Sequence, residues 1–245
     1  VPTLPRDTDA GLEPVRVNRN QVTSEPTTQI TLGVNLPASD TQFDPAAIDP
    51  PDPHTSSIEY FDNLGRKETL TVTYTPTVPA SGSSNEWTMV ISDSATDVAT
   101  NPIAEYTITF DGSPTAGGTL ASVTTVSGGT YDATSGTMIV DVAGGPIELT
   151  IGSPSTSEGL TQVGESFKQL NISKNGSEAG SMTTVEVDEL GFVTAVFDTG
   201  ATKVIYQVPL VDVPNPNGLI AFDRQVYAPS PESGNFFLWD AGDGP

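Results

Sequence analysis

The residues with the clearest chemical potential are Asp198, Thr199 and Gly200, which follow the apolar run at 195–197. In this setting an Asp-Thr-Gly sequence is the motif that carries the catalytic carboxylate of aspartic proteases. That chemistry needs two carboxylates sharing one proton, because a lone Asp cannot act as both base and acid. The chain holds no second Asp-Thr-Gly or Asp-Ser-Gly, and segment 218–224 lacks the Gly-Arg pair typical of dimeric proteases. The pattern favours a hairpin turn over a protease.

Other reactive groups are few. His54 is the only histidine and stands in a Pro-rich stretch, so we expect an exposed loop side chain rather than a member of a Ser-His-Asp triad. The acidic clusters at 7–11 and 240–245 lack the ligand spacing of a helix-loop-helix calcium site. Asn171-Ile-Ser and Asn175-Gly-Ser match the N-glycosylation pattern. We expect no catalytic residue, no metal site and no cofactor.

Composition narrows the function classes further. The 245 residues include no Cys, which excludes disulfides, thiolate metal sites and a Cys nucleophile. A net charge of −22 argues against nucleic acid and anionic membranes as partners, since phosphate binding needs clustered Lys and Arg. No apolar run approaches the roughly 18 residues of a membrane span. Val1 opens the chain without a leader segment, so we expect trimmed ends or an export signal outside this span.

The patterning predicts an all-β chain, because 23 Gly and 21 Pro favour many short strands over long helices. Ile30, Leu32, Val34 and Leu36 alternate with polar residues as in a half-buried strand. The Pro-rich stretch at 37–57 predicts a long loop and a first domain boundary. Further strands are expected at 58–61, 70–74, 86–92, 105–110, 119–126, 137–142 and 147–151.

The turns and the last third complete this expectation. Asp62 to Gly65 and Asp188 to Gly191 share the sequence Asp-x-Leu-Gly, with Asp at the first turn position and Gly at the fourth. Between 160 and 170, helical spacing predicts a helix, which Gly164 disfavours. Three successive strands should follow, with Gly200 at the left-handed position of the second hairpin. Their expected inward residues are Val185 and Val187; Val193, Ala195 and Phe197; and Val204, Tyr206 and Val208.

The last third also resembles the core of bacterial flagellar hook proteins and their axial relatives. In that family an Asn-Gly, a spacer and a Gly lead through an Asp-x-x-Gly turn and a polar-Gly turn to an Asn-x-x-Gly-Leu stretch. The matching residues here are Asn175, Gly176, Gly180, Asp188, Gly191, Asp198, Gly200, Gln207, Asn215, Gly218 and Leu219. Val213-Pro214 stands where Phe-Ala is usual, and Asp-Thr-Gly where Ser-Asn-Gly is commoner. The 57–75 segment, with Asp62 and Gly65, resembles the hairpin that enters the family's outer domain.

The resemblance implies two β domains of barrel or sandwich type, the outer inserted into a discontinuous inner one. We expect the inner domain at 1–36 plus 160–245 and the outer domain at 37–159. Neither end carries a heptad pattern, so the family's terminal helical segments are expected to be missing from this core fragment. Without them we predict a soluble monomer.

The implied function is structural. Family members polymerise into the short curved hook, a universal joint that transmits motor torque to the filament. The implied partners are further copies of the chain and other axial proteins at the hook ends, and the implied location is the extracellular flagellum, reached without a cleavable signal peptide. A distal rod protein and a secreted surface adhesin are the alternatives. The rod protein would lack much of the 37–159 insertion, and the adhesin should show aromatic clusters or calcium spacings.

Overall fold

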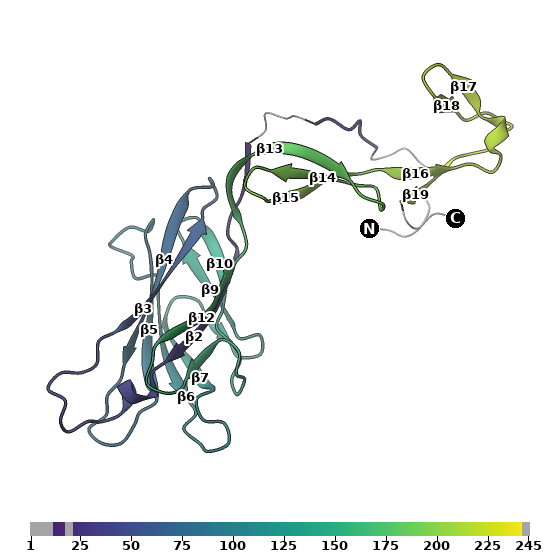
Figure 1. The fold of residues 1–245 in the computed structure, drawn as a ribbon. Helices are drawn as coiled ribbons and strands as arrows, with labels where there is room; N and C mark the ends of the chain where they lie inside the picture. Colours follow the sequence, from purple (N-terminus) through teal and green to yellow (C-terminus); the bar gives the residue numbers. More distant parts are fainter. Residues whose placement is uncertain (1–11, 18–21, 242–245) are drawn as a thin grey trace. The chain divides into compact units, whose positions relative to one another are not determined.

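The computed structural model describes residues 12–17 and 22–241, and it is built almost entirely from β-strands (Figure 1). Two compact units divide the chain: the larger is Thr23–Ala179, and the smaller combines Val1–Val22 with Gly180–Pro245. The all-β prediction with one unit inserted into another is confirmed. The units divide at 22/23 and 179/180, whereas the sequence-based boundaries lie at 36/37 and 159/160. In the described part of the chain, no helix has the length and apolar character of a membrane span.

A five-stranded antiparallel meander forms one sheet of the larger unit, in the order β3-β4-β5-β6-β7. Strands β4, β5 and β6 alternate buried apolar and partly exposed polar residues, as in β5, where Trp87, Met89 and Ile91 are fully buried. In β7 only Leu120 is buried. The predicted strands of this segment are confirmed. Their bounds are β3 His54–Phe61, β4 Lys67–Pro76, β5 Glu86–Asp93, β6 Ala104–Phe110 and β7 Leu120–Ser127.

The second sheet of the larger unit is organised around β2, Gln29–Leu36. Residues 29–31 of β2 pair in parallel with β10, and residues 34–36 pair in parallel with β11. Antiparallel β12 pairs with 30–35 of the same strand, and β10 continues through β9 to β8. The bounds are β8 Tyr131–Asp132, β9 Thr137–Val142, β10 Gly145–Thr150, β11 Leu160–Gln162 and β12 Lys168–Lys174.

One hydrophobic core joins the inward faces of the two sheets into a sandwich (Figure 1). The four alternating residues predicted for β2 are all at most 1% exposed. Leu70, Val72 and Tyr74 of β4 are fully buried as well, as their alternation with threonines predicts. Full burial of one such side chain contributes roughly 1.5–3 kcal/mol, so this core holds the larger unit together.

The smaller unit contains shorter sheets. β13 (Ser177–Val187), β14 (Phe192–Phe197) and β15 (Thr202–Gln207) follow β1 (Val22–Glu25) in a four-stranded sheet. The chain passes between the units within β1 and β13. Two antiparallel pairs complete the fold: β16 (Pro209–Asp212) with β19 (Phe237–Asp240), and β17 (Ile220–Phe222) with β18 (Val226–Ala228).

The helix expected between 160 and 170 is wrong. The chain forms β11, a turn with Gly164 at φ +68°, and β12. Both strands pair with β2, so their backbone N–H and C=O groups are hydrogen-bonded across the sheet. The spacing of apolar residues within the segment does not reveal this distant partner. The long loop expected at 37–57 is shorter, because β3 begins at His54 and a short 3-10 helix, η1, spans Ala38–Thr41.

The expected inward faces of the last three strands are only partly correct. Val193, Ala195 and Phe197 of β14 are buried, as predicted. Val187, Val204 and Val208 are 63%, 57% and 42% exposed and contradict the expectation. A register shift in β15 pairs Val204 with Thr194, on the face opposite to the buried residues of β14. Val187 is the last residue of β13, and Val208 lies beyond the end of β15.

Candidate functional site

The Asp-Thr-Gly motif lies in the hairpin between β14 and β15. The Phe197 amide donates to the Ala201 carbonyl at 2.9 Å, which leaves 198–200 as a three-residue loop, and Gly200 has φ +83°. One Asp198 carboxylate oxygen accepts a hydrogen bond from the Ser181 amide of β13 at 2.9 Å. The predicted hairpin turn is therefore confirmed, and the carboxylate is bound to the backbone of the neighbouring strand.

Gly180 lies next to this turn, and a larger residue there would require the side chains of Asp198 and Thr199 to shift. A Cβ at Gly180 would lie 2.7 Å from the Asp198 carboxylate and 2.8 Å from the Thr199 methyl. The structure thus places Gly180 beside Asp198, two residues of the family-like pattern.

The two Asp-x-Leu-Gly turns share one hydrogen-bonding pattern. In the first, an Asp62 carboxylate oxygen accepts from the amides of Leu64 and Arg66 at 2.9 and 2.8 Å, and the Gly65 amide donates to the Asp62 carbonyl. In the second, Asp188 accepts from the amides two and four residues on, at 3.0 and 2.8 Å, and Gly191 closes the turn. Gly65 and Gly191 have φ of +75° and +74°, which explains the glycine in both turns.

Asp62 is more firmly held than Asp188. Its second carboxylate oxygen lies 2.7 Å from the Arg66 guanidinium. Burial raises the pKa of Asp62, but hydrogen bonds from Arg66 and Leu64 outweigh it and hold the pKa below its usual value.

Asn175 and Gly176 form a further turn beside the Asp62 turn. The Asn175 side-chain oxygen accepts from the amides of Thr28 and Gln29 at 2.8 and 2.9 Å, and its nitrogen donates to the Thr28 hydroxyl at 2.8 Å. Gly176 has φ +85°. The turn thus fixes the segment by which the chain enters the larger unit.

Buried Thr27 connects these two turns. Its hydroxyl donates to the Asn175 carbonyl at 3.1 Å and accepts from the Phe61 amide at 3.0 Å. Gly65 packs closely against the first and last strands of the larger unit, since a Cβ there would lie 2.7 Å from Ser24 and 3.1 Å from Ala179. Four of the singled-out residues therefore gather where the chain enters and leaves the larger unit: Asp62, Gly65, Asn175 and Gly176.

The Asn-x-x-Gly-Leu stretch forms a separate turn in the smaller unit. A 3-10 turn, η2, spans Pro216–Gly218, in which the Gly218 amide donates to the Asn215 carbonyl at 3.0 Å. Asn215 binds the carbonyl of Glu232 through its side chain at 3.1 Å. Leu219 lines an apolar groove of about 420 Å³, and its other lining residues are Leu12, Val211, Val213, Tyr227, Pro229, Phe236 and Leu238.

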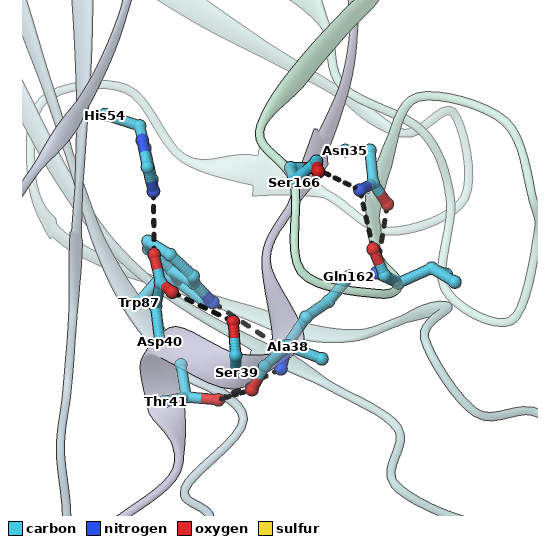
Figure 2. A network of polar contacts seen from close by, with 10 residues as sticks. Asn35, Ala38, Ser39, Asp40, Thr41, His54, Trp87, Gln162 and Ser166 are labelled. Atoms are coloured by element: carbon cyan, nitrogen blue, oxygen red, sulfur yellow. Dashed lines mark hydrogen bonds and ion pairs between the residues drawn. The ribbon is translucent and has the colours of Figure 1, made fainter. Parts of the chain in front are cut away.

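His54 belongs to a polar network of the larger unit, which Figure 2 shows. Its Nε2 lies 2.8 Å from the Asp40 carboxylate, and its ring stacks on Phe167 with centroids 4.8 Å apart. The side chain is 25% exposed and stands in the first residue of β3. The expectation of an exposed loop histidine is wrong, because the Asp40 carboxylate and the aromatic ring of Phe167 enclose the imidazole.

Gln162 is the centre of the buried half of this network (Figure 2). Its side-chain oxygen accepts from the Trp87 indole at 3.3 Å, and its nitrogen donates to the Thr41 hydroxyl at 3.0 Å. Asn35 of β2 donates to the carbonyls of Val163 and Ser166 at 2.8 and 3.0 Å. These contacts join β2, η1, β5 and β11, so the network secures strands rather than presenting a reactive group.

Asp93 is an important residue that the sequence pattern did not single out. It is 1% exposed, and its carboxylate accepts hydrogen bonds from the Tyr60 hydroxyl at 2.7 Å and the Thr96 hydroxyl at 2.6 Å. Burial raises the pKa of Asp93, but these bonds and two backbone amides outweigh it and lower the pKa. The alternation of β5 could have predicted the burial of Asp93, because it places residue 93 on the same face of the strand as Trp87.

No cation site accompanies these carboxylates in the described residues, since no three His, Cys, Asp or Glu side chains there are grouped to hold a metal ion. The acidic residues at 7–11 and 242–245 lie outside the described part. What the site offers chemically is a set of glycine turns, a buried polar network and one apolar groove.

The comparisons with known proteins identify the family. The family model described as "Flagellar basal body protein FlaE D2 domain" matches residues 35–177. The chain belongs to the flagellar hook protein family. The flagellar hook protein FlgE of Brucella suis biovar 1 is 31% identical over 238 residues, which cover 97% of this chain and 52% of that protein. The hook protein FlgE of Caulobacter vibrioides is 37% identical over 91 residues, which cover 37% of this chain and 15% of that protein.

A solved structure is also similar. The crystal structure of Helicobacter pylori flagellar hook protein FlgE2 matches with a TM-score of 0.47 and 18% identity, covering 78% of this chain and 40% of that one. The chain spans about half the length of the Brucella hook proteins it matches. The resemblance stated from the sequence is confirmed at the level of the family.

Proposed function

We propose that this chain is the core of a structural subunit of the bacterial flagellar hook, which polymerises into a curved, flexible tube and transmits motor torque to the filament. The observation that carries the proposal is the match to hook proteins along 97% of the chain. Its role is structural rather than catalytic: Asp198 serves a hairpin turn, and His54 serves a network that joins strands.

The domain assignment is part of this proposal. The larger, inserted unit corresponds to the outer domain expected at 37–159, and the smaller, discontinuous unit to the inner domain expected at 1–36 plus 160–245. The compact division favours moving these boundaries to 22/23 and 179/180. The glycine turns at Gly65 and Gly176 support the new boundaries. Gly65 packs against Ser24 and Ala179, and Gly176 packs against Glu25 and Thr27, all of which lie near the two ends of the larger unit.

The proposed mechanism is mechanical. Subunits on the inside of a bend must approach one another and separate again once per rotation, so their contacts should be modest, polar and hydrated, like transient interfaces. Strand β7 exposes the polar residues Ser122, Thr124 and Ser127, together with apolar Val126. The partners are further copies of the chain and axial proteins at the hook ends, the location is outside the cell, and export uses no cleavable signal. The isolated chain is a monomer.

Immunogold electron microscopy tests this proposal. Antibodies raised against the chain are applied to intact flagella of the source cell, with a mutant lacking the gene as control. We expect gold on the short curved segment between the cell surface and the filament. Label on the rod would assign the chain to another axial protein. Label on the cell surface or in the medium alone would favour a secreted adhesin and refute the hook assignment.

A further inference from the structure

Two Asn-Gly dipeptides occur in the chain, Asn175-Gly176 and Asn217-Gly218. In such a pair the glycine nitrogen can attack the carbonyl carbon of the Asn side chain and expel ammonia. Water then opens the resulting succinimide to aspartate or isoaspartate. The reaction requires the side-chain carbonyl to turn into contact with that nitrogen, and glycine presents no Cβ to obstruct the approach.

The fold hinders this reaction at Asn175. Its side chain makes three hydrogen bonds, to the amides of Thr28 and Gln29 and to the Thr28 hydroxyl, at 2.8–2.9 Å. All three must break before the carbonyl carbon can turn toward the Gly176 nitrogen. The backbone is held too, because the Asn175 amide donates to the Gln29 carbonyl at 3.1 Å.

Asn217 is in the opposite situation. It is exposed, and in the described part of the chain its side chain makes no hydrogen bond. It lies in the single turn η2, where one bond of 3.0 Å holds the Gly218 nitrogen to the Asn215 carbonyl. Opening that bond frees the attacking nitrogen, while the Ser230 hydroxyl still holds the Gly218 carbonyl.

We propose that Asn217 is a site of spontaneous deamidation and that the fold protects Asn175. Three side-chain hydrogen bonds must open at Asn175 against one backbone bond at Asn217, so the reactive conformation at Asn175 should be about 30-fold rarer. The inference rests on the local contacts of two turns and is independent of the hook assignment.

The modification alters the turn in which it occurs. Aspartate adds a negative charge at residue 217, and isoaspartate adds a methylene to the backbone of η2. That backbone is tightly placed: the Ser230 hydroxyl donates to the Gly218 carbonyl at 2.6 Å, and a Cβ on Gly218 would lie 2.6 Å from Glu232. Isoaspartate should therefore displace the chain leading into β17.

Peptide mapping by mass spectrometry tests the proposal. The purified chain is incubated at mildly alkaline pH, and the conversion of each Asn-Gly pair is followed over time beside synthetic peptides spanning 171–180 and 213–222. The two peptides should react at similar rates, whereas the folded chain should convert Asn217 about 30-fold faster than Asn175. Equal rates at the two sites in the folded chain, or an Asn217 that stays intact while its peptide converts, would overturn the proposal.

Two variants sharpen the test. Thr28→Ala removes one hydrogen-bond partner of Asn175 and should accelerate conversion there without changing Asn217. Asn217→Ser removes the reactive side chain and should abolish the isoaspartate signal from that peptide. Gly218→Ala is unsuitable as a blocking control because its Cβ would collide with the backbone of Glu232.

Discussion

Replacing Asp93 with Asn should strongly lower the free energy of unfolding of the larger unit, although the two side chains have nearly the same shape. The carboxylate of Asp93 receives four donors: the hydroxyls of Tyr60 and Thr96 and the amides of Ala95 and Ala143, at 2.6–3.2 Å. Each carboxylate oxygen receives one hydroxyl and one amide. The NH₂ group of Asn must therefore face one backbone amide in either orientation, and that amide cannot turn away.

The magnitude follows from these contacts. An unsatisfied buried donor costs about 1–3 kcal/mol, and the remaining bonds weaken because their acceptor is no longer charged. We therefore expect Asp93→Asn to lower the free energy of unfolding of the larger unit by about 3 kcal/mol at neutral pH. Tyr60→Phe removes one donor and leaves the others paired, so it should lower the same free energy by about 1.5–2 kcal/mol.

Urea unfolding followed by tryptophan fluorescence measures these values. The chain has two tryptophans, and Trp87 reports on the larger unit if Trp239, which lies in the smaller unit, is replaced by Phe in all variants. The double variant of Asp93 and Tyr60 should lose less than the sum of the single losses by about 1 kcal/mol or more, because both changes act on one bond.

The pH dependence gives the decisive outcome. The pKa of Asp93 is lowered in the folded state, so its charge stabilises the fold above the unfolded pKa of about 3.9. That contribution disappears as the pH falls through the lower folded value, and the difference between the chain and Asp93→Asn should shrink below about pH 4. A loss under about 0.5 kcal/mol at neutral pH, or a difference that grows in acid, would refute the reasoning.

Three further predictions concern other features. Gly65→Ala should destabilise the larger unit by more than Gly82→Ala, because both have φ near +75° but only Gly65 is crowded, with Ser24 at 2.7 Å; equal losses in urea unfolding would show that the crowding relaxes. Asp198→Ala should lower the stability of the smaller unit by about 1 kcal/mol through the lost bond to Ser181, and acid-optimum cleavage blocked by a transition-state analogue would contradict this structural role. Under the proposed hook function, the net charge of −22 on this chain should make its association with further copies more favourable as salt rises; light scattering that falls with salt would exclude charge repulsion as the barrier.

Strands β2 and β4 of the larger unit were predictable because they are half-buried and alternate cleanly. Ile30 to Leu36 and Leu70 to Tyr74 each have one buried face, and a period of two fixes which residues face inward. The Asp-x-Leu-Gly turns were predictable as well, since the backbone bonds of Asp62 and the positive φ of Gly65 are local properties of four residues.

Other features depend on partners that are distant in the sequence. The segment at 160–170 has helical spacing, but its backbone pairs with β2, more than 120 residues earlier. Val204 is exposed because of a register shift that no single strand reveals. His54 is enclosed by Asp40 and Phe167, which come from two other segments, so its surroundings could not be read from its Pro-rich neighbours.

The pairing of β2 has a consequence for the order of folding. This strand ends at Leu36, yet its partners β10, β11 and β12 occupy 145–174. The central strand of this sheet pairs with strands more than 100 residues away, which gives the sheet a high contact order. Such topologies fold slowly because a long loop must close before the strands can pair. The first strand of this sheet to leave the ribosome thus remains unpaired until nearly the whole larger unit has been made.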